Sequence, residues 1–200
     1  MSIIMAFPKR LAWMIGLLFS SFASGIFAQT PGIQILFLND YQQDQQLVVD
    51  ASVKFEFSEA VLKAIHHEIT LTFTTELTLN EVHRVFGLPL ERNRASLRYQ
   101  TQLQYDGFNR QYVITNQRNQ NIRRFSNLTD AMKTLGTLSN FPVADLSDLH
   151  PNTLYSLQMR ISLDRWQLPT PLIIDTLWSP AWQLDSGWYP TQIQSPKSWL

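Results

Sequence analysis

Three consecutive residues, His66, His67 and Glu68, form the group in this sequence that could most readily hold a metal ion. Neighbouring residues on a helix point about 100° apart, so the two imidazoles cannot face one ion without distortion. A helical zinc site needs histidines at i and i+4, and the HExxH spacing is absent. His83 could complete a site only if its strand passed nearby. We therefore expect a solvated helix C-terminus, where histidine also suits the helix dipole, and we predict no metal or other cofactor.

Other catalytic arrangements are also absent from the sequence. The chain has no cysteine, which excludes a cysteine nucleophile, a thiolate metal site and a disulfide framework. It has no G-x-S-x-G turn for a serine nucleophile and no glycine-rich phosphate loop. Sixteen acidic residues are present, but no pair stands out as the two carboxylates of a glycosidase. The sequence therefore predicts a protein that is not an enzyme, with no catalytic residue and no identified small-molecule substrate.

The N-terminal segment predicts export. Lys9 and Arg10 precede an almost wholly apolar run, Leu11–Phe27, which is followed by small residues. We predict that residues 1–28 are a signal peptide cleaved near its end. The alternative is an uncleaved N-terminal anchor, because an apolar run of about 17 residues is at the lower limit for spanning a bilayer. The protein would then be periplasmic, or anchored to the inner membrane and facing the periplasm.

Apolar and polar residues alternate with a period of two along much of the remaining chain, as in half-buried β-strands. Two short helices are expected, one after Ser58 as N-cap and one after Ser126 as N-cap. The pattern predicts a mainly β fold, either an antiparallel β-sandwich or an open barrel with two short helices, in one domain over residues 29–187. Strands or strand pairs are expected over Ile33–Leu38, Leu47–Phe57, Ile69–Leu79, Leu97–Thr115 and Leu154–Asp164.

The stretch Leu97–Thr115 carries the clearest hairpin signal. Asp106-Gly107 supplies two residues that tolerate positive φ, as a tight primed turn requires. A two-residue turn there would place Leu103 opposite Arg110. We therefore expect positive φ at Gly107 and a hairpin that acts as scaffold rather than as a reaction centre.

Charge is distributed unevenly along a chain whose formal net charge is zero. Residues 84–124 contain eight arginines and only two acidic residues. This basic stretch could be neutralised by acidic residues on neighbouring strands, or it could form a basic face for an anionic partner such as lipid headgroups. An exported chain that is not basic overall is not expected to bind nucleic acid.

The last residues, 188–200, form an expected C-terminal tail rich in aromatic residues and proline. Proline cannot donate to a sheet ladder, so we expect no central strand in this tail. We expect Trp178 and Trp182, before the tail, to cap the core. Aromatic residues free of the core suit contact with a partner or a membrane. The candidate contact residues are Trp188, Tyr189 and Trp199.

Several longer motifs are spread along the chain. LVVDASVKFEFSEAVLKAI runs from a strand into the first helix, followed by TLTFTTEL and LQYDGFNRQYVI, and then by LPTPL and the W-x-L-x-S-x-W ending at Trp188. From about Leu36 to Trp188 the sequence resembles the domain of unknown function 4390 family. The resemblance implies a bacterial protein with an N-terminal signal or anchor and no assigned activity or catalytic residue. Genes of this family often lie near those of membrane sensor kinases, which points to the cell envelope.

These observations predict an exported, non-enzymatic envelope protein that works by contact. Its partner would be an envelope protein or a membrane surface, met through exposed edge strands or the aromatic tail. The alternative is a sandwich or barrel that binds a lipid or glycan between its sheets. An open apolar pocket would favour the alternative, whereas a filled core with a flat aromatic patch would favour protein contact.

Overall fold

The computed structural model describes residues 32–194. The expected signal peptide or anchor and Trp199 lie outside these residues. Among residues 32–194, no helix is long and apolar enough to cross a membrane. The strands are β1 (Gly32–Gln43), β2 (Gln46–Glu56), β3 (Leu71–Val85), β4 (Leu88–Asp106), β5 (Gln111–Asn116), β6 (Asn121–Phe125), β7 (Thr137–Asp145), β8 (Leu154–Leu163) and β9 (Tyr189–Gln194). The helices are α2 (Glu59–His66), α3 (Leu128–Leu135) and α4 (Thr170–Trp178), with short 3₁₀ turns η1 (Leu146–Asp148), η2 (Arg165–Gln167) and η3 (Pro180–Trp182).

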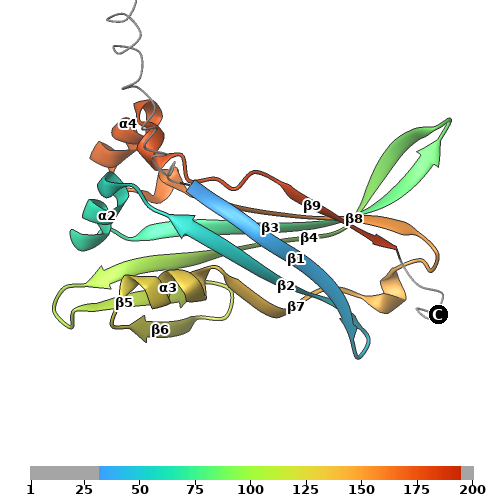
Figure 1. Cartoon of the computed structure of the whole chain (residues 1–200), viewed down its shortest axis with the longest axis horizontal. Helices are drawn as coiled ribbons and strands as arrows, with labels where there is room; N and C mark the ends of the chain where they lie inside the picture. The colour runs from blue at the N-terminus through green and yellow to red at the C-terminus, as the bar shows by residue number, and fades with distance from the viewer. Residues whose placement is uncertain (1–31, 195–200) are drawn as a thin grey trace, which may run out of the picture. The chain divides into compact units, whose positions relative to one another are not determined.

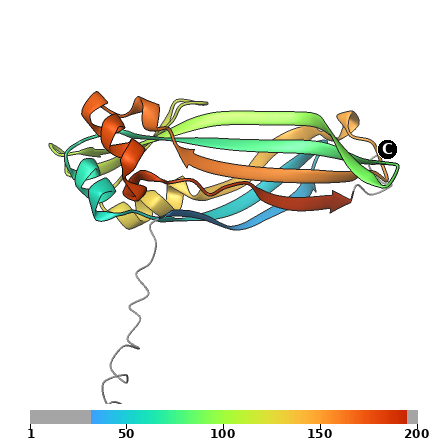
Figure 2. The same ribbon diagram turned by 90° about the horizontal axis from the view of Figure 1, so that it is seen from above.

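The strands form two antiparallel sheets (Figure 1). The smaller sheet has the order β1-β2-β7, and the larger has the order β6-β5-β4-β3-β8-β9. Figure 2 shows the two sheets as separate layers. The prediction of a mainly β, antiparallel fold is confirmed, and the sheets do not close into a barrel.

The core lies between the facing sides of the two sheets. Alternate residues of β8 point into it, and five of them are buried: Tyr155, Leu157, Met159, Ile161 and Leu163. Phe55 of β2 meets Phe73 of β3 edge to face, with ring centroids 5.3 Å apart. Burying a large apolar side chain contributes about 1.5–3 kcal/mol, so these rows supply most of the force that holds the sheets together.

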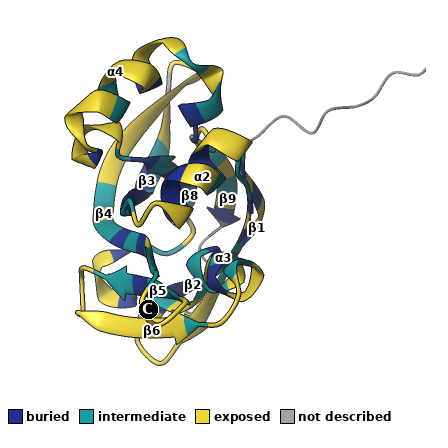
Figure 3. Cartoon of the chain, turned by 90° about the vertical axis from the view of Figure 1, so that its left-hand side faces the viewer, coloured by how far each residue is buried: buried dark blue, intermediate teal, exposed yellow. Residues whose placement is uncertain are grey.

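The two predicted helices are present, and each begins at a side-chain cap. Ser58 Oγ accepts a hydrogen bond from the Val61 amide at the start of α2, as predicted. The cap of α3 is Asn127 rather than Ser126, because the Asn127 side chain accepts the Asp130 amide at 2.8 Å. Figure 3 shows α2 with buried residues toward the sheets, whereas α4 is mostly exposed.

The Leu97–Thr115 hairpin exists, but the predicted two-residue turn is wrong. Leu103 lies opposite Ile114, so the strands are joined by a four-residue loop, 107–110. Arg110 adopts positive φ (54°), and Gly107 does not. The Asp106 carboxylate sets the wider loop, because it accepts both the amide and the side-chain N–H of Asn109, at 3.0 and 2.7 Å.

The tight primed turn of this protein lies instead between β3 and β4. Val85 pairs directly with Leu88, and the two residues between them, Phe86 and Gly87, have φ of 52° and 80°. Left-handed conformation at both central residues defines a type I′ turn. Phenylalanine is an unusual residue at the first of these positions, since Asn and Asp are the usual choices.

Four further elements were not expected from the sequence. Strand β6 is an almost fully exposed edge strand, and β7 contains Pro142 at the edge of the smaller sheet. The third is helix α4, which contains the apolar residues Leu172, Ile173 and Ile174. Trp178 in α4 is 86% exposed, whereas Trp182 is buried, so only one of the two tryptophans caps the core. The fourth element is β9, which pairs with β8.

Candidate functional site

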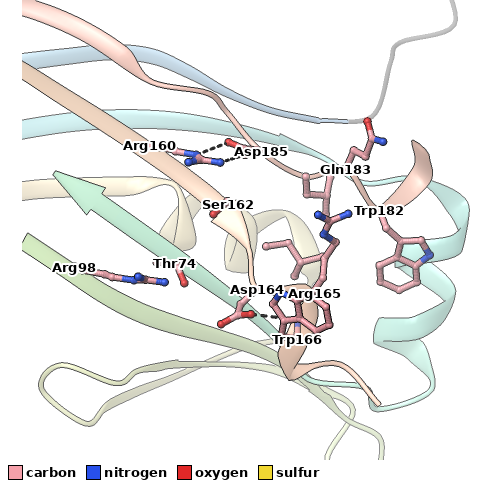
Figure 4. A pocket seen from close by; sticks show the side chains of 12 residues that line it. Thr74, Arg98, Arg160, Ser162, Asp164, Arg165, Trp166, Trp182, Gln183 and Asp185 are labelled. Carbon is pink, nitrogen blue, oxygen red and sulfur yellow. Dashed lines mark hydrogen bonds and ion pairs between the residues drawn. The ribbon is translucent and has the colours of Figure 1, made fainter. Parts of the chain in front are cut away.

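A pocket of about 400 Å³ opens on the outer face of the larger sheet (Figure 4). Thr74 of β3 and Ser162 of β8, which are register partners, form its floor. They face outward because their neighbours in the chain, such as Phe73, point into the core. The walls are formed by Arg98, Arg160, Asp164, Arg165, Trp166 and the segment 182–185.

The walls are held in place by hydrogen bonds to the ends of β3 and β8. The Asp164 amide donates to the Thr72 carbonyl at 2.8 Å, and the Asp164 carboxylate accepts the Trp166 amide at 3.2 Å. These bonds start η2 and fold it back over the sheet. On the other side, the Leu163 amide donates to the Leu184 carbonyl at 2.8 Å, which fixes the strand-like segment before Asp185.

Arg160 and Asp185 form the strongest ion pair of the pocket. Arg160 Nε donates to Asp185 Oδ1 at 3.0 Å, and Arg160 Nη2 pairs with Oδ2. The Arg160 hydrogen bond lowers the pKa of Asp185, and the Asp185 hydrogen bond raises the pKa of Arg160. This bidentate pair uses much of the donor capacity of Arg160.

The other two arginines of the pocket have weaker partners. Arg98, whose side chain is 66% exposed, reaches Glu76 only at 3.9 Å. Arg165 Nη1 donates to the Thr176 carbonyl at 3.3 Å and forms no ion pair among the described residues. Both guanidiniums therefore retain N–H donors that can reach a ligand in the pocket.

A second polar cluster surrounds Glu81, whose side chain is only 3% exposed. Arg94 Nε donates to Glu81 Oε2 at 2.6 Å, while His83 Nε2 and His150 Nδ1 each lie 3.2 Å from Oε1. Burial raises the pKa of Glu81, but the hydrogen bond and charge of Arg94, aided by both histidines, hold it below its ordinary value. The cluster joins β3, β4 and the loop before β8. Glu81 lies seven residue steps along β3 from Thr74, which corresponds to about 23 Å.

A third feature is the end of the β3–β4 hairpin, residues 83–92, which we call the arm. The β3–β8 ladder ends at the Val82–Leu154 pair, and within residues 32–194 β3 and β4 continue without other strands beside them (Figure 1). Three apolar residues of the arm are exposed: Phe86 fully, Leu88 at 70% and Leu90 at 55%. The arm is therefore a two-stranded ribbon with an apolar end and two free edges.

Of the three residues predicted to make contact, Trp188 and Tyr189 lie within residues 32–194, and Tyr189 is placed differently from expectation. Tyr189 begins β9, lies opposite Met159 and packs against the core. Trp188 is 44% exposed, and the Arg160 guanidinium lies 6.0 Å from its ring centroid. Ile193 is buried, so the expectation of a tail free of the core is wrong for Tyr189–Gln194. Because β9 is an edge strand, its proline is accommodated there.

The histidines singled out in the sequence are separated as expected for a helix end. His66 Nε2 lies 3.0 Å from the Tyr112 hydroxyl, and His67 is the C-cap of α2. Glu68 accepts the Gly107 amide at 3.1 Å and so fixes the loop between β4 and β5. Within residues 32–194, no three histidine, cysteine or acidic side chains are grouped so that they could hold a metal ion.

Sequence reasoning missed the pocket, the Glu81 cluster and the arm. The pocket residues come from four separate segments that only the strand register brings together, so no local motif marks them. The arm did carry a signal. Gly87 interrupts a strand-like run directly after Phe86, which indicates a turn. A two-residue turn at Phe86-Gly87 predicts that Leu88 and Leu90 lie beyond the sheet.

The fold and its pocket define a small, mainly β domain of two antiparallel sheets. A family profile described as domain of unknown function (DUF4390) matches residues 31–192, which is most of the chain. The chain therefore belongs to this family, as the resemblance of its motifs predicted. Comparisons with curated proteins and with solved structures give no significant match.

Proposed function

We propose that this protein is an exported, non-enzymatic protein of the cell envelope that binds a partner protein through the arm. The observation that carries the proposal is the exposure of Phe86, Leu88 and Leu90 at the end of a ribbon that projects from the domain. Apolar residues grouped in this way contribute little to the fold, and such patches are typical of interaction sites.

Backbone strain at the end of the arm also supports a role in binding. Phe86 combines a left-handed backbone conformation with a fully exposed side chain. A non-glycine residue in this conformation costs about 1–2 kcal/mol, and within the domain no burial of the ring offsets that cost. A partner that buries the ring would offset it, because a large aromatic side chain is a typical binding anchor.

The free edges of the arm favour a protein over a lipid surface as the partner. Beyond Val82, the outward N–H and C=O groups of β3 face no strand, and β4 has no second strand neighbour before Thr101. A partner strand can satisfy these groups, whereas lipid hydrocarbon cannot. Arg84 and Arg92 flank the apolar end, so an apolar groove with an acidic rim beside a strand edge would fit the arm.

The other parts of the proposal rest on the sequence and on the pockets. The basic residues and apolar run before Ala28 support export. The alternative of a lipid held between the sheets has less support, because the facing sides of the sheets carry closely packed buried residues. The pocket described above lies on the outer face and is lined mainly by polar and charged side chains.

Site-directed photocrosslinking in native envelopes tests the arm. With the crosslinker at Leu88, we expect one discrete protein adduct, and Leu90→Ser should reduce its yield at least fivefold. Leu177 of α4 is the matched control position, since it is 58% exposed and lies on a different element. Ile174→Ser on the same helix should leave the Leu88 adduct unchanged.

Three results would contradict the proposal. One is a Leu88 adduct that consists only of lipid. Another is a protein adduct whose yield does not respond to Leu90→Ser. The third is a discrete adduct at Leu177 with none at Leu88, which would place the contact on α4.

A further inference from the structure

We propose that the pocket on the outer face of the larger sheet binds an anionic saccharide, meaning a sugar ring that carries a carboxylate or a phosphate. The proposal is independent of the arm, because the two features lie at opposite ends of β3. It concerns four side chains that come together only in the fold: Thr74, Arg98, Arg165 and Trp166.

Positive charge in the pocket is only partly neutralised. Asp185 is fully engaged by Arg160 and by the Gly187 amide, which donates to it at 2.9 Å. The Asp164 carboxylate accepts hydrogen bonds from Gln100, Trp166 and Gln167, so it is occupied as well. Arg98 and Arg165 keep free donors that face the same space, and a planar guanidinium suits a carboxylate or a phosphate.

A buried hydroxyl at the floor of the pocket gives an independent indication of a ligand. Thr74 is 3% exposed, and its Oγ1 has no hydrogen-bond partner among the described residues, 32–194. Buried polar atoms are nearly always paired, because an unpaired one costs about 1–3 kcal/mol. The neighbouring outward threonine, Thr72, is paired with the Gln167 side chain at 3.2 Å. A ligand hydroxyl or anionic oxygen in the pocket would satisfy Thr74.

Trp166, the exposed aromatic residue in the wall of the pocket, indicates that the ligand also contains a ring. The Trp166 ring is 77% exposed although η2 holds its backbone in place. A flat, exposed indole beside polar groups suits a ring with one apolar face and hydroxyls at its edge, as in a sugar. The volume of about 400 Å³ lies within the range of about 300–1,000 Å³ that is usual for small-molecule sites.

Other ligand classes fit the pocket less well. Three arginines and two aspartates line the pocket, so its net charge is positive and disfavours a metal cation. The polar floor of Thr74 and Ser162 offers little to an acyl chain. A neutral sugar would leave the donors of Arg98 and Arg165 unpaired. The combination of free guanidinium donors, an unpaired hydroxyl and an exposed indole therefore selects a saccharide with an anionic group.

Calorimetric titration of the protein purified from the envelope tests the proposal. The probes are glucuronate and glucose 1-phosphate, which separate carboxylate from phosphate as the source of charge, with glucose as the neutral control. We expect saturable one-to-one binding of at least one anionic sugar and at least tenfold weaker binding of glucose. Arg98→Gln and Thr74→Val should each weaken binding about tenfold, because each removes a hydrogen bond to a charged ligand.

Arg124→Gln is the matched control, since Arg124 is an exposed arginine on β6 and does not line the pocket. It should leave affinity unchanged. Arg98 is on the surface, so its variant should fold even if Thr74→Val does not. Absence of saturable binding for both anionic sugars, equal binding of glucose, or unchanged affinity in Arg98→Gln would each overturn the proposal.

Discussion

At the scale of single residues, buried charge is the feature that separates this domain from a simple apolar sandwich. Glu81 occupies an inward position of β3, in the row that contains Leu77 and Leu79. A lone carboxylate there would be too costly to bury, so Arg94 is brought in by an irregularity of the β3–β4 register next to Leu79. Removing one partner of such a pair leaves a buried charge without compensation.

Glu81→Gln is therefore expected to lower the free energy of unfolding at neutral pH by about 3 kcal/mol. The wild-type carboxyl has a pKa below its ordinary value of 4.5. Its stabilising contribution is complete above that ordinary pKa and is lost as pH falls through the lower pKa of the folded state. Urea denaturation between pH 3 and pH 7 should show a smaller pH dependence below about pH 4.5 in the variant than in wild type.

Glu91→Gln is the control, because Glu91 is an exposed carboxylate on the arm. It should change the free energy of unfolding by less than about 0.5 kcal/mol at neutral pH. If the Glu81 variant matches the control at every pH, the buried cluster contributes nothing to stability.

At the scale of elements, the sequence predicts best those strands that have one buried and one exposed face. The alternation of apolar and polar residues in Leu154–Leu163 and in the strand before Ser58 is sufficient to predict both strands. Burial of one face imposes this period of two directly. β6 could not be found in this way, since nearly all of it is exposed. The sequence predicts a two-residue turn at Asp106-Gly107, but the chain forms a four-residue loop there. The hydrogen bonds that the Asp106 carboxylate accepts from Asn109 stabilise this loop in competition with the tight turn.

The arm is the element in which local stability and proposed function are opposed. Phe86→Asn should stabilise the arm by about 0.5–1 kcal/mol, because asparagine tolerates the left-handed conformation of a type I′ turn better than phenylalanine does. Amide hydrogen exchange of residues 83–90 measures this local stability and should slow in the variant. Gly87→Ala, at φ of 80°, should accelerate exchange in the same segment. Faster exchange in Phe86→Asn would show that the phenylalanine ring supports the turn.

At the scale of the whole domain, the two sheets share one core, and residues far apart in the chain complete it. The pocket and the Glu81 cluster could not be predicted from the sequence, because each also brings together residues that are far apart in the chain. Thr74, Arg98 and Arg160 are adjacent only because β3 lies between β4 and β8 in a particular register. Composition and patterning indicate that such a sheet forms, but they do not specify which outward residues meet.

The C-terminal strand β9 is part of the folded domain and is expected to contribute to its stability. Cutting the chain after Gly187 removes β9, which forms six register pairs with β8 between Tyr189 and Gln194, and it removes the buried Ile193. Burial of one isoleucine contributes about 1.5–3 kcal/mol, and each hydrogen bond about 0.5–1.5 kcal/mol. Loss of this side chain and these hydrogen bonds therefore removes several kcal/mol from the free energy of unfolding, which is about 5–15 kcal/mol for a typical domain.

We therefore expect a large fall in melting temperature, or loss of cooperative unfolding, in the protein cut after Gly187. A protein cut after Gln194 keeps β9 and lacks only residues 195–200, so it is the matched control and should melt within a few degrees of wild type. Ile193→Ala in the full chain should fall between them, because it removes the buried side chain but leaves the ladder in place. Equal thermal melts for the two truncated proteins would mean that β9 adds no stability and that the core closes at β8.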